Sequence, residues 1–200
     1  MPRKPLDPQR PVILPWRIVV DSAETQPWTF TGIKASPAKG RRPIIVETVT
    51  RCLGRHPDSY GDYTLETVDG RHSALDWCAI ERKSLADFQD TLLNFTDDRH
   101  ARFEQEMRNY RAMIITGGCA CVIVEANFDT AIEQAPAFGT KTAVQNARSI
   151  LGTILAMSQD YGVPWLPMGN RRLAELAAFQ YLQRFWKHHK ALIVPSDERA

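Results

Sequence analysis

Three residues near the middle of the chain have the side chains and the spacing that phosphodiester hydrolysis requires. Asp62 comes first, Glu81 follows nineteen residues later, and Lys83 stands two residues beyond Glu81. Side chains at positions i and i+2 of a strand point to the same face, so Glu81 and Lys83 are expected to project together. Such hydrolysis needs a divalent cation held by carboxylates and a positive side chain beside the reacting groups. We therefore predict that Asp62, Glu81 and the backbone carbonyl of Arg82 bind Mg²⁺ or Mn²⁺, and that Lys83 positions the nucleophilic water.

Two strands must bring these residues together, and they are expected over residues 62–67 and 75–82. If the two strands pair as a hairpin, Asp62 reaches the same place as Glu81. Further strands are expected over 17–21, 43–49, 119–125 and 163–166, helices over 84–93, 98–115, 141–161 and 170–190, and a loop over 126–140. The apolar stripe of the helix over 141–161 is expected to consist of Val144, Ala147, Leu151, Ile154 and Leu155. This order of elements predicts an α/β fold with a mixed central sheet flanked by helices.

The residues around this site resemble the GD…ERKxxxD signature of the XPF-type nucleases, the group that contains XPF, Mus and Hef. The matching residues are Gly61-Asp62, Glu81-Arg82-Lys83 and Asp87. Residues 19–24 (VVDSAE) are similar to the opening VDxRE strand of the family, 102–111 to its basic helix, and 122–125 to the next strand. The resemblance covers residues 17–190 and implies a restriction-endonuclease-like PD-(D/E)xK core in a small phage or bacterial relative. It departs at Ala23, where many members have arginine.

The resemblance implies roles for Asp21 and Glu24, and residue spacing suggests roles for Asp87 and Arg82. Asp21 and Glu24 are expected to line the site, with Glu24 nearer to the metal or its waters. Asp87 is either a capping-box partner of Ser84 or a residue that orients the site. Arg82 points to the face opposite Glu81, where it forms either a phosphate contact or a structural ion pair.

The charge distribution suggests where DNA binds. The net charge is only +2, but residues 1–55 hold ten Lys/Arg against four Asp/Glu, and residues 56–98 hold three against ten. An acidic centre between basic segments suits a metal site beside a phosphate-binding surface. Arg102 and Arg108 of the helix over 98–115, together with Arg41 and Arg42 of a basic loop, are the predicted phosphate contacts. The alternative is that these arginines form solvated faces only.

The function predicted from these residues is a Mg²⁺-dependent DNA endonuclease, and the resemblance implies work in DNA repair or recombination. Two alternatives stay open: a catalytically silent DNA-binding nuclease fold, and a resolvase or restriction-type nuclease on the same fold. Neither a helix-hairpin-helix repeat nor a helicase motor is recognisable, so the preferred DNA structure is open as well. It could be a flap, a fork, a junction or plain duplex.

The organisation predicted is a proline-rich basic arm over 1–16, a nuclease domain over 17–190 and a tail over 191–200. The helix over 170–190 is apolar over more than the ~100° stripe that one core requires, which predicts a homodimer. The alternative is that the arm covers the second face with Val12, Ile13, Leu14 and Trp16. The four cysteines form no zinc pattern, and no export signal or membrane span is recognisable. We expect a cytoplasmic protein of a bacterial or phage-infected cell, with Cys119 and Cys121 as small buried residues.

Overall fold

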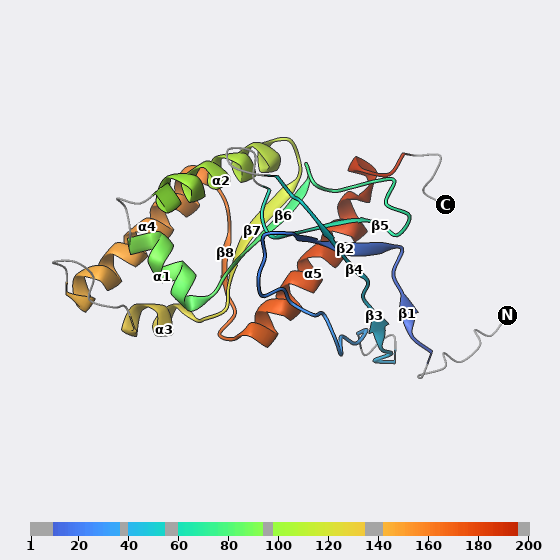
Figure 1. Cartoon of the computed structure of the whole chain (residues 1–200), viewed down its shortest axis with the longest axis horizontal. Coiled ribbons are helices and arrows are strands. Elements are labelled where there is room, and N and C mark those ends of the chain that lie inside the picture. The colour runs from blue at the N-terminus through green and yellow to red at the C-terminus, as the bar shows by residue number, and fades with distance from the viewer. Residues whose placement is uncertain (1–9, 37–39, 55–59, 94–97, 135–141, 196–200) are drawn as a thin grey trace.

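The computed structural model describes residues 10–36, 40–54, 60–93, 98–134 and 142–195. The first nine residues of the predicted arm, residues 196–200 of the predicted tail and residues 37–39, 55–59, 94–97 and 135–141 lie outside that range. The central sheet has six strands in the order β4-β2-β5-β6-β7-β8 (Figure 1). Its strands are β2 (Trp16–Asp21), β4 (Thr48–Arg51), β5 (Tyr63–Thr67), β6 (Cys78–Lys83), β7 (Cys119–Val124) and β8 (Trp165–Pro167).

The sheet is mixed, as the sequence predicted. β5 runs antiparallel to both of its neighbours, β2 and β6, whereas the β2–β4, β6–β7 and β7–β8 pairs are parallel. The antiparallel β5–β6 pair places Tyr63 opposite Ile80, so the residues that precede Tyr63 and follow Ile80 are neighbours. The predicted hairpin is therefore present, and it brings Asp62 beside Glu81.

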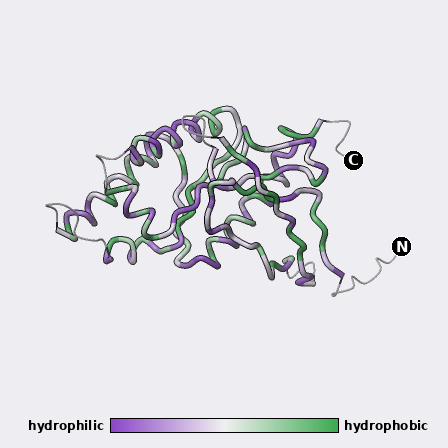
Figure 2. The backbone as a smooth tube through the Cα atoms, in the orientation of Figure 1, coloured by the Kyte–Doolittle hydropathy of each residue, from purple (hydrophilic) through white to green (hydrophobic). Residues whose placement is uncertain are grey.

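Helices cover both faces of the sheet. The helix α5 (Arg171–His189) packs on one face, and α1 (Leu85–Leu93), α2 (Asp98–Ile115), α3 (Phe128–Glu133) and α4 (Ala143–Tyr161) pack on the other (Figure 1). A short 3-10 helix, η2 (Lys190–Leu192), follows α5. Much of α2 consists of hydrophilic residues, whereas the central strands consist mainly of hydrophobic residues (Figure 2). Within the described residues, no helix has the length and apolar character needed to cross a membrane.

Alternate residues of β6 enter two separate hydrophobic cores. Cys78 and Ile80 belong to the core beneath α5, and Ala79 belongs to the core beneath α1, α2 and α4. By the two-residue period of a strand, Glu81 and Lys83 continue the α2 side and Arg82 continues the α5 side. This alternation places Glu81 and Lys83 on one face of the sheet and Arg82 on the other.

Three predicted segments differ from the structure. The expected strand over 43–49 is two short strands: β3 (Ile44–Ile45) pairs with β1 (Val12–Ile13) in a separate two-stranded sheet, and β4 pairs with β2. The expected loop over 126–140 contains α3, whose N-terminus is capped when the Asn127 side chain accepts a hydrogen bond from Thr130 N–H. The arm does not extend to residue 16, because Leu14 and Trp16 are buried in the core.

The burial of the two long C-terminal helices also corrects two expectations. In α4 the buried residues are Asn146, Ile150, Ile154 and Met157, while Val144, Leu151 and Leu155 are exposed, so the predicted stripe is wrong except at Ile154. In α5, whose N-terminus is capped by the Asn170 side chain, most apolar residues pack inside the chain. Trp16 stacks on Phe179 with ring centroids 5.9 Å apart, and Leu14 is also buried in this core, whereas Ile13 is 74% exposed. The alternative of cover by the N-terminal segment therefore holds for part of that segment.

Candidate active site

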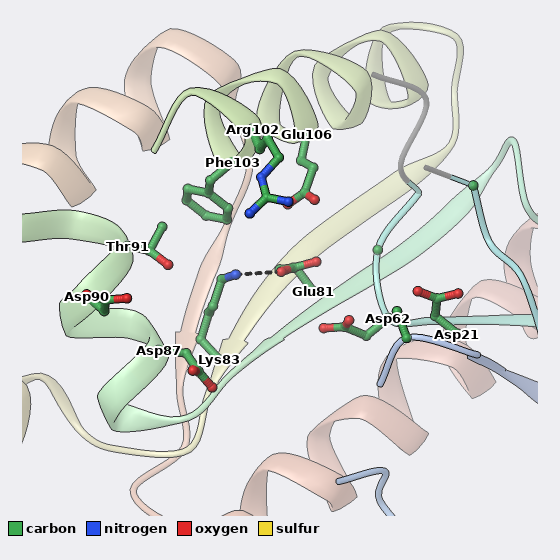
Figure 3. A pocket seen from close by; sticks show the side chains of 13 residues that line it. Asp21, Asp62, Glu81, Lys83, Asp87, Asp90, Thr91, Arg102, Phe103 and Glu106 are labelled. Atoms are coloured by element: carbon green, nitrogen blue, oxygen red, sulfur yellow. Dashed lines mark ion pairs between the residues drawn. The ribbon is translucent and has the colours of Figure 1, made fainter. Parts of the chain in front are cut away.

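A cleft of about 590 Å³ opens between the sheet and helices α1 and α2 (Figure 3). Its size is in the range of small-molecule binding sites. The predicted residues Asp62, Glu81 and Lys83 all line it, so the sheet does gather them in one place. The other lining residues are Asp21, Ala23, Gly54, Gly61, Asp87, Asp90, Thr91, Arg102, Phe103 and Glu106.

Gly61 is required by the close approach of the chain to β6. Its φ is +83°, and a Cβ there would lie 2.9 Å from the Ile80 carbonyl oxygen and 2.9 Å from the Tyr110 hydroxyl. Both the backbone conformation and the contacts favour glycine. The next residue is then fixed from two sides, because Asp62 N–H donates to Ile80 O at 2.9 Å and Asp62 Oδ2 accepts from Arg82 N–H at 2.7 Å. The Gly-Asp pair thus aims the Asp62 carboxylate at β6.

The two carboxylates of the predicted metal site share a desolvated environment. Burial and the neighbouring charge of Glu81 raise the pKa of Asp62 well above its ordinary value. A group with a raised pKa is easier to ionise when a positive charge is brought to it. The Asp62–Glu81 pair therefore favours a cation between them.

Lys83 supplies a fixed positive charge at the same point. Its Nζ lies 2.7 Å from Glu81 Oε1 and 4.7 Å from the centre of the Phe103 ring (Figure 3). Burial alone would lower the pKa of Lys83, but the charges of Glu81 and Glu106 outweigh it and the pKa is raised. Lys83 is consequently an ammonium ion at neutral pH, able to donate hydrogen bonds and to stabilise negative charge.

Arg82 points to the opposite face and forms buried ion pairs. Its guanidinium donates to both carboxylate oxygens of Glu24 at 3.1 and 3.2 Å, and to both oxygens of Glu125 at 2.8 and 3.1 Å. The three side chains are only 6%, 7% and 11% exposed, and the guanidinium carbon lies 5.9 Å from the centre of the Trp28 ring. Of the two roles that the sequence left open, this geometry favours the structural ion pair over the phosphate contact.

The other acidic candidates fall in three different places. Glu24 is turned towards Arg82 and does not line the cleft. Asp21 lines it, but one carboxylate oxygen accepts from Leu53 N–H at 3.0 Å. Asp87 lines it from α1, while Ser84 Oγ accepts from Asp87 N–H at 3.2 Å and donates to Asp87 Oδ2 at 2.6 Å. The Ser84–Asp87 part of the capping interpretation is thus present, on a residue that also faces the site.

The four predicted DNA-binding arginines outside β6 do not form one surface. Arg102 lines the cleft, but Arg108, about 120° further around α2, pairs with Glu104 at 3.1 Å on the exposed side. Arg41 and Arg42 precede β3 and do not line the cleft, whereas Asp21, the last residue of β2, does. Arg42 also donates to the carbonyl oxygens of Arg10 and Pro11 at 2.7 and 3.2 Å. Of the four, only Arg102 is placed at the site.

The donor set suits a hard divalent cation that keeps part of its water shell. Six carboxylates line the cleft against two cationic side chains, Lys83 and Arg102, so a phosphodiester would be repelled without a bridging cation. Within the described ranges, no three His, Cys, Asp or Glu side chains converge closely enough to hold a metal ion between them. Two carboxylate ligands and several waters are the usual arrangement for Mg²⁺. Asp62 and Glu81 fit that arrangement.

Several residues of the site were not assigned to it from the sequence. Glu125 and Trp28 hold Arg82, while Tyr110 and Phe103 contact the Glu81–Lys83 pair. Phe103 and Tyr110 are buried core residues, and their helical spacing with Glu106 along α2 is the signal that could have placed them beside the site. Glu125 gave none, because its partner depends on the alignment of β6 with β7.

The mixed central sheet and the helical layers on its two faces form a restriction-endonuclease-like fold. No protein-family model matches the chain. No curated protein matches it either. Among solved structures, XPF from Aeropyrum pernix is similar over 88% of this chain and 67% of its own, with a TM-score of 0.52 and 18% sequence identity.

A second structure, XPF from Aeropyrum pernix in complex with DNA, is similar over 86% of this chain and 65% of its own. Its TM-score is 0.49 and its sequence identity is 18%. The first of the two likenesses shows that this chain has the fold of XPF, which confirms the fold that the sequence resemblance implied.

Proposed function

We propose that this protein is a DNA endonuclease that uses Mg²⁺ or Mn²⁺ to hydrolyse phosphodiester bonds. The observation that carries the proposal is the joint placement of Asp62, Glu81 and Lys83 in one acidic cleft. The XPF fold is a second support, since it is independent of how those side chains are placed. Asp62 and Glu81 would hold the cation, with the Arg82 carbonyl as the further ligand predicted from the sequence.

The residues of the cleft divide the work between them. When bound, the cation supplies the charge that polarises the phosphate and acidifies a water. Lys83 keeps its proton and donates from Nζ towards the attacking water or a phosphate oxygen, where negative charge develops. Arg102 enters the cleft from α2 and attracts the DNA backbone. Arg82 stays outside the reaction and holds the end of β6 in place.

Cleavage of labelled DNA tests the proposal. The panel contains a plain duplex, a flap, a fork and a four-way junction, each incubated with Mg²⁺, with Mn²⁺ or with EDTA. We expect cutting only with a divalent cation, and the pattern of cut sites identifies the preferred DNA structure. Asp62→Asn, Glu81→Gln and Lys83→Met should each slow cleavage by at least about 10²-fold, because each removes charge at the transition state.

A matched variant and a binding assay separate loss of chemistry from loss of folding. Glu133→Gln neutralises an exposed carboxylate on α3, outside the cleft, and should cleave like wild type. Binding measured in Ca²⁺ should be retained by all the cleft variants. Tight binding without cleavage by wild type would favour the catalytically silent alternative, and cleavage in EDTA would exclude the metal mechanism.

We also propose a homodimer, with its interface on α4 in place of the α5 interface that the sequence suggested. The structure accounts for the breadth of the apolar surface of α5 within one chain. An apolar stripe is instead exposed on α4, where Val144, Leu151 and Leu155 are 63%, 45% and 52% exposed at helical spacing. We propose that two copies associate through this stripe. Light scattering of wild type and of Leu151→Asp at micromolar concentration tests it, and a monomer mass for wild type would rule it out.

A further inference from the structure

Tyr110 of α2 reaches the catalytic carboxylate from the side opposite the lysine. The residue is fully buried, and its hydroxyl donates to Glu81 Oε2 at 3.1 Å. The other oxygen of the same carboxylate, Oε1, lies 2.7 Å from Lys83 Nζ. The two Glu81 oxygens therefore have different partners, one from the strand and one from the helix.

This contact matters because a glutamate carboxylate has no strong rotational preference of its own. The terminal torsion of glutamate is broad, so hydrogen bonds must fix the plane of the two oxygens. Lys83 fixes only one of them. The hydroxyl of Tyr110 fixes the second and thereby determines which lone pairs face the cleft.

The same hydroxyl also packs against the segment that supplies the other carboxylate. A Cβ on Gly61 would lie 2.9 Å from the Tyr110 oxygen, so the hydroxyl occupies the space beside Gly61, directly before Asp62. One buried atom is thus in contact with Glu81 and in close approach to the residue before Asp62.

We propose that Tyr110 is a positioning residue of the metal site, whose hydroxyl orients the Glu81 carboxylate for cation binding. The inference rests on the proposed function, because it assigns Tyr110 a task in that same site. Residues that orient metal ligands through hydrogen bonds typically contribute about 10–100-fold to metal affinity or activity. Phenylalanine at position 110 would keep the ring and its packing and remove only the hydroxyl.

The test measures cation binding by the full chain in the absence of DNA. Mn²⁺ is titrated into wild type and Tyr110→Phe, and free Mn²⁺ is followed by electron paramagnetic resonance. We expect the dissociation constant to rise by about 10–100-fold in Tyr110→Phe. In cleavage assays, the half-saturating Mg²⁺ concentration should rise by a similar factor, whereas the rate at saturating Mg²⁺ should change much less.

The matched control is Tyr161→Phe. Tyr161 of α4 donates to Glu104 Oε1 at 3.0 Å, so this variant also removes a tyrosine hydroxyl bound to a glutamate of α2, outside the cleft. Tyr161→Phe should bind Mn²⁺ like wild type. The Mn²⁺ concentration at half-saturation depends only on the folded molecules. If Tyr110→Phe were merely less stable, fewer molecules would bind Mn²⁺, but the dissociation constant of those that bind would be unchanged.

A further variant tests whether Tyr110 acts through Glu81. In a Glu81→Gln background, the additional change Tyr110→Phe should have little further effect on Mn²⁺ affinity, since neighbours in one network are not additive. Equal Mn²⁺ affinity of wild type and Tyr110→Phe would overturn this inference alone. Failure of wild type to bind Mn²⁺ would overturn the metal-dependent function and this inference with it.

Discussion

The ion pairs of Arg82 allow a prediction that decides between its two possible roles. Arg82→Met keeps a long, apolar side chain but removes the guanidinium from Glu24 and Glu125, in a region where all three side chains are nearly buried. Glu125 keeps a second partner, Arg171 at 3.0 Å, so the larger loss is expected at Glu24. Breaking a buried pair by removing one partner costs about 3–5 kcal/mol. With a urea m-value of roughly 2 kcal/mol/M, that loss lowers the unfolding midpoint by about 1.5–2.5 M.

The measurement is urea unfolding followed by circular dichroism, with Arg108→Met as the control. Arg108 also pairs with a glutamate, but its side chain is 51% exposed, and exposed pairs of this spacing contribute only about 0.3–0.5 kcal/mol. DNA binding is measured at several salt concentrations in parallel. A loss below about 1 kcal/mol in Arg82→Met, with a salt slope reduced by about one phosphate contact, would refute the structural role and restore the phosphate contact.

Three further predictions follow from single contacts. Gly61→Ala should destabilise the protein by more than Gly117→Ala in urea unfolding. Both glycines have positive φ, but of the two only Gly61 would place a Cβ within 4 Å of other atoms. Equal losses of stability would mean that the close approach to Ile80 is absent. Arg102→Ala should weaken DNA binding and reduce its salt slope by about one, while Arg108→Ala leaves the slope unchanged, and the reverse order would place the DNA on the outer side of α2. Burial opposes ionisation of Glu125, but hydrogen bonds from Arg82 and Trp28 outweigh the effect of burial and lower the pKa of Glu125. Ionised Glu125 therefore stabilises the fold at pH values above the ordinary glutamate pKa. This stabilisation is lost as the pH falls through the lowered pKa. Thermal unfolding of Glu125→Gln between pH 3 and 7 should therefore show a weaker acid dependence than wild type, and an unchanged profile would contradict the assignment.

The elements that place the catalytic pattern could be predicted because they are defined by local sequence. The hairpin of β5 and β6 and the helices α2 and α5 each follow from the period of the apolar residues. The α/β class followed from the order of elements and from the XPF resemblance. The i, i+2 spacing was enough to put Glu81 and Lys83 on one face of β6, where both line the cleft.

What could not be predicted depends on contacts between segments far apart in the chain. The partners of Arg82 come from residue 24 and residue 125, and nothing near β6 specifies either. The buried side of α4 was misassigned because Val144, Leu151 and Leu155 are as apolar as the residues that the core uses. Arg41 and Arg42 were grouped with Arg102 by charge alone, and only the position of β3 separates them from the cleft.

The alternation of Glu81, Arg82 and Lys83 across β6 also bears on how the strand finds its alignment during folding. A slip of one residue would turn Glu81 and Lys83 into the apolar layer beneath α5 and would direct Arg82 towards the cleft. The slip would move the Arg82 guanidinium away from Glu24 and Glu125 and would bury the charge of Glu81 among apolar residues. The charged triplet therefore penalises the misaligned hairpin more strongly than an apolar strand would. A chain that replaces Arg82 with leucine should accordingly refold with a larger misfolded fraction, a cost that would fall on assembly and not on the chemistry of the finished site.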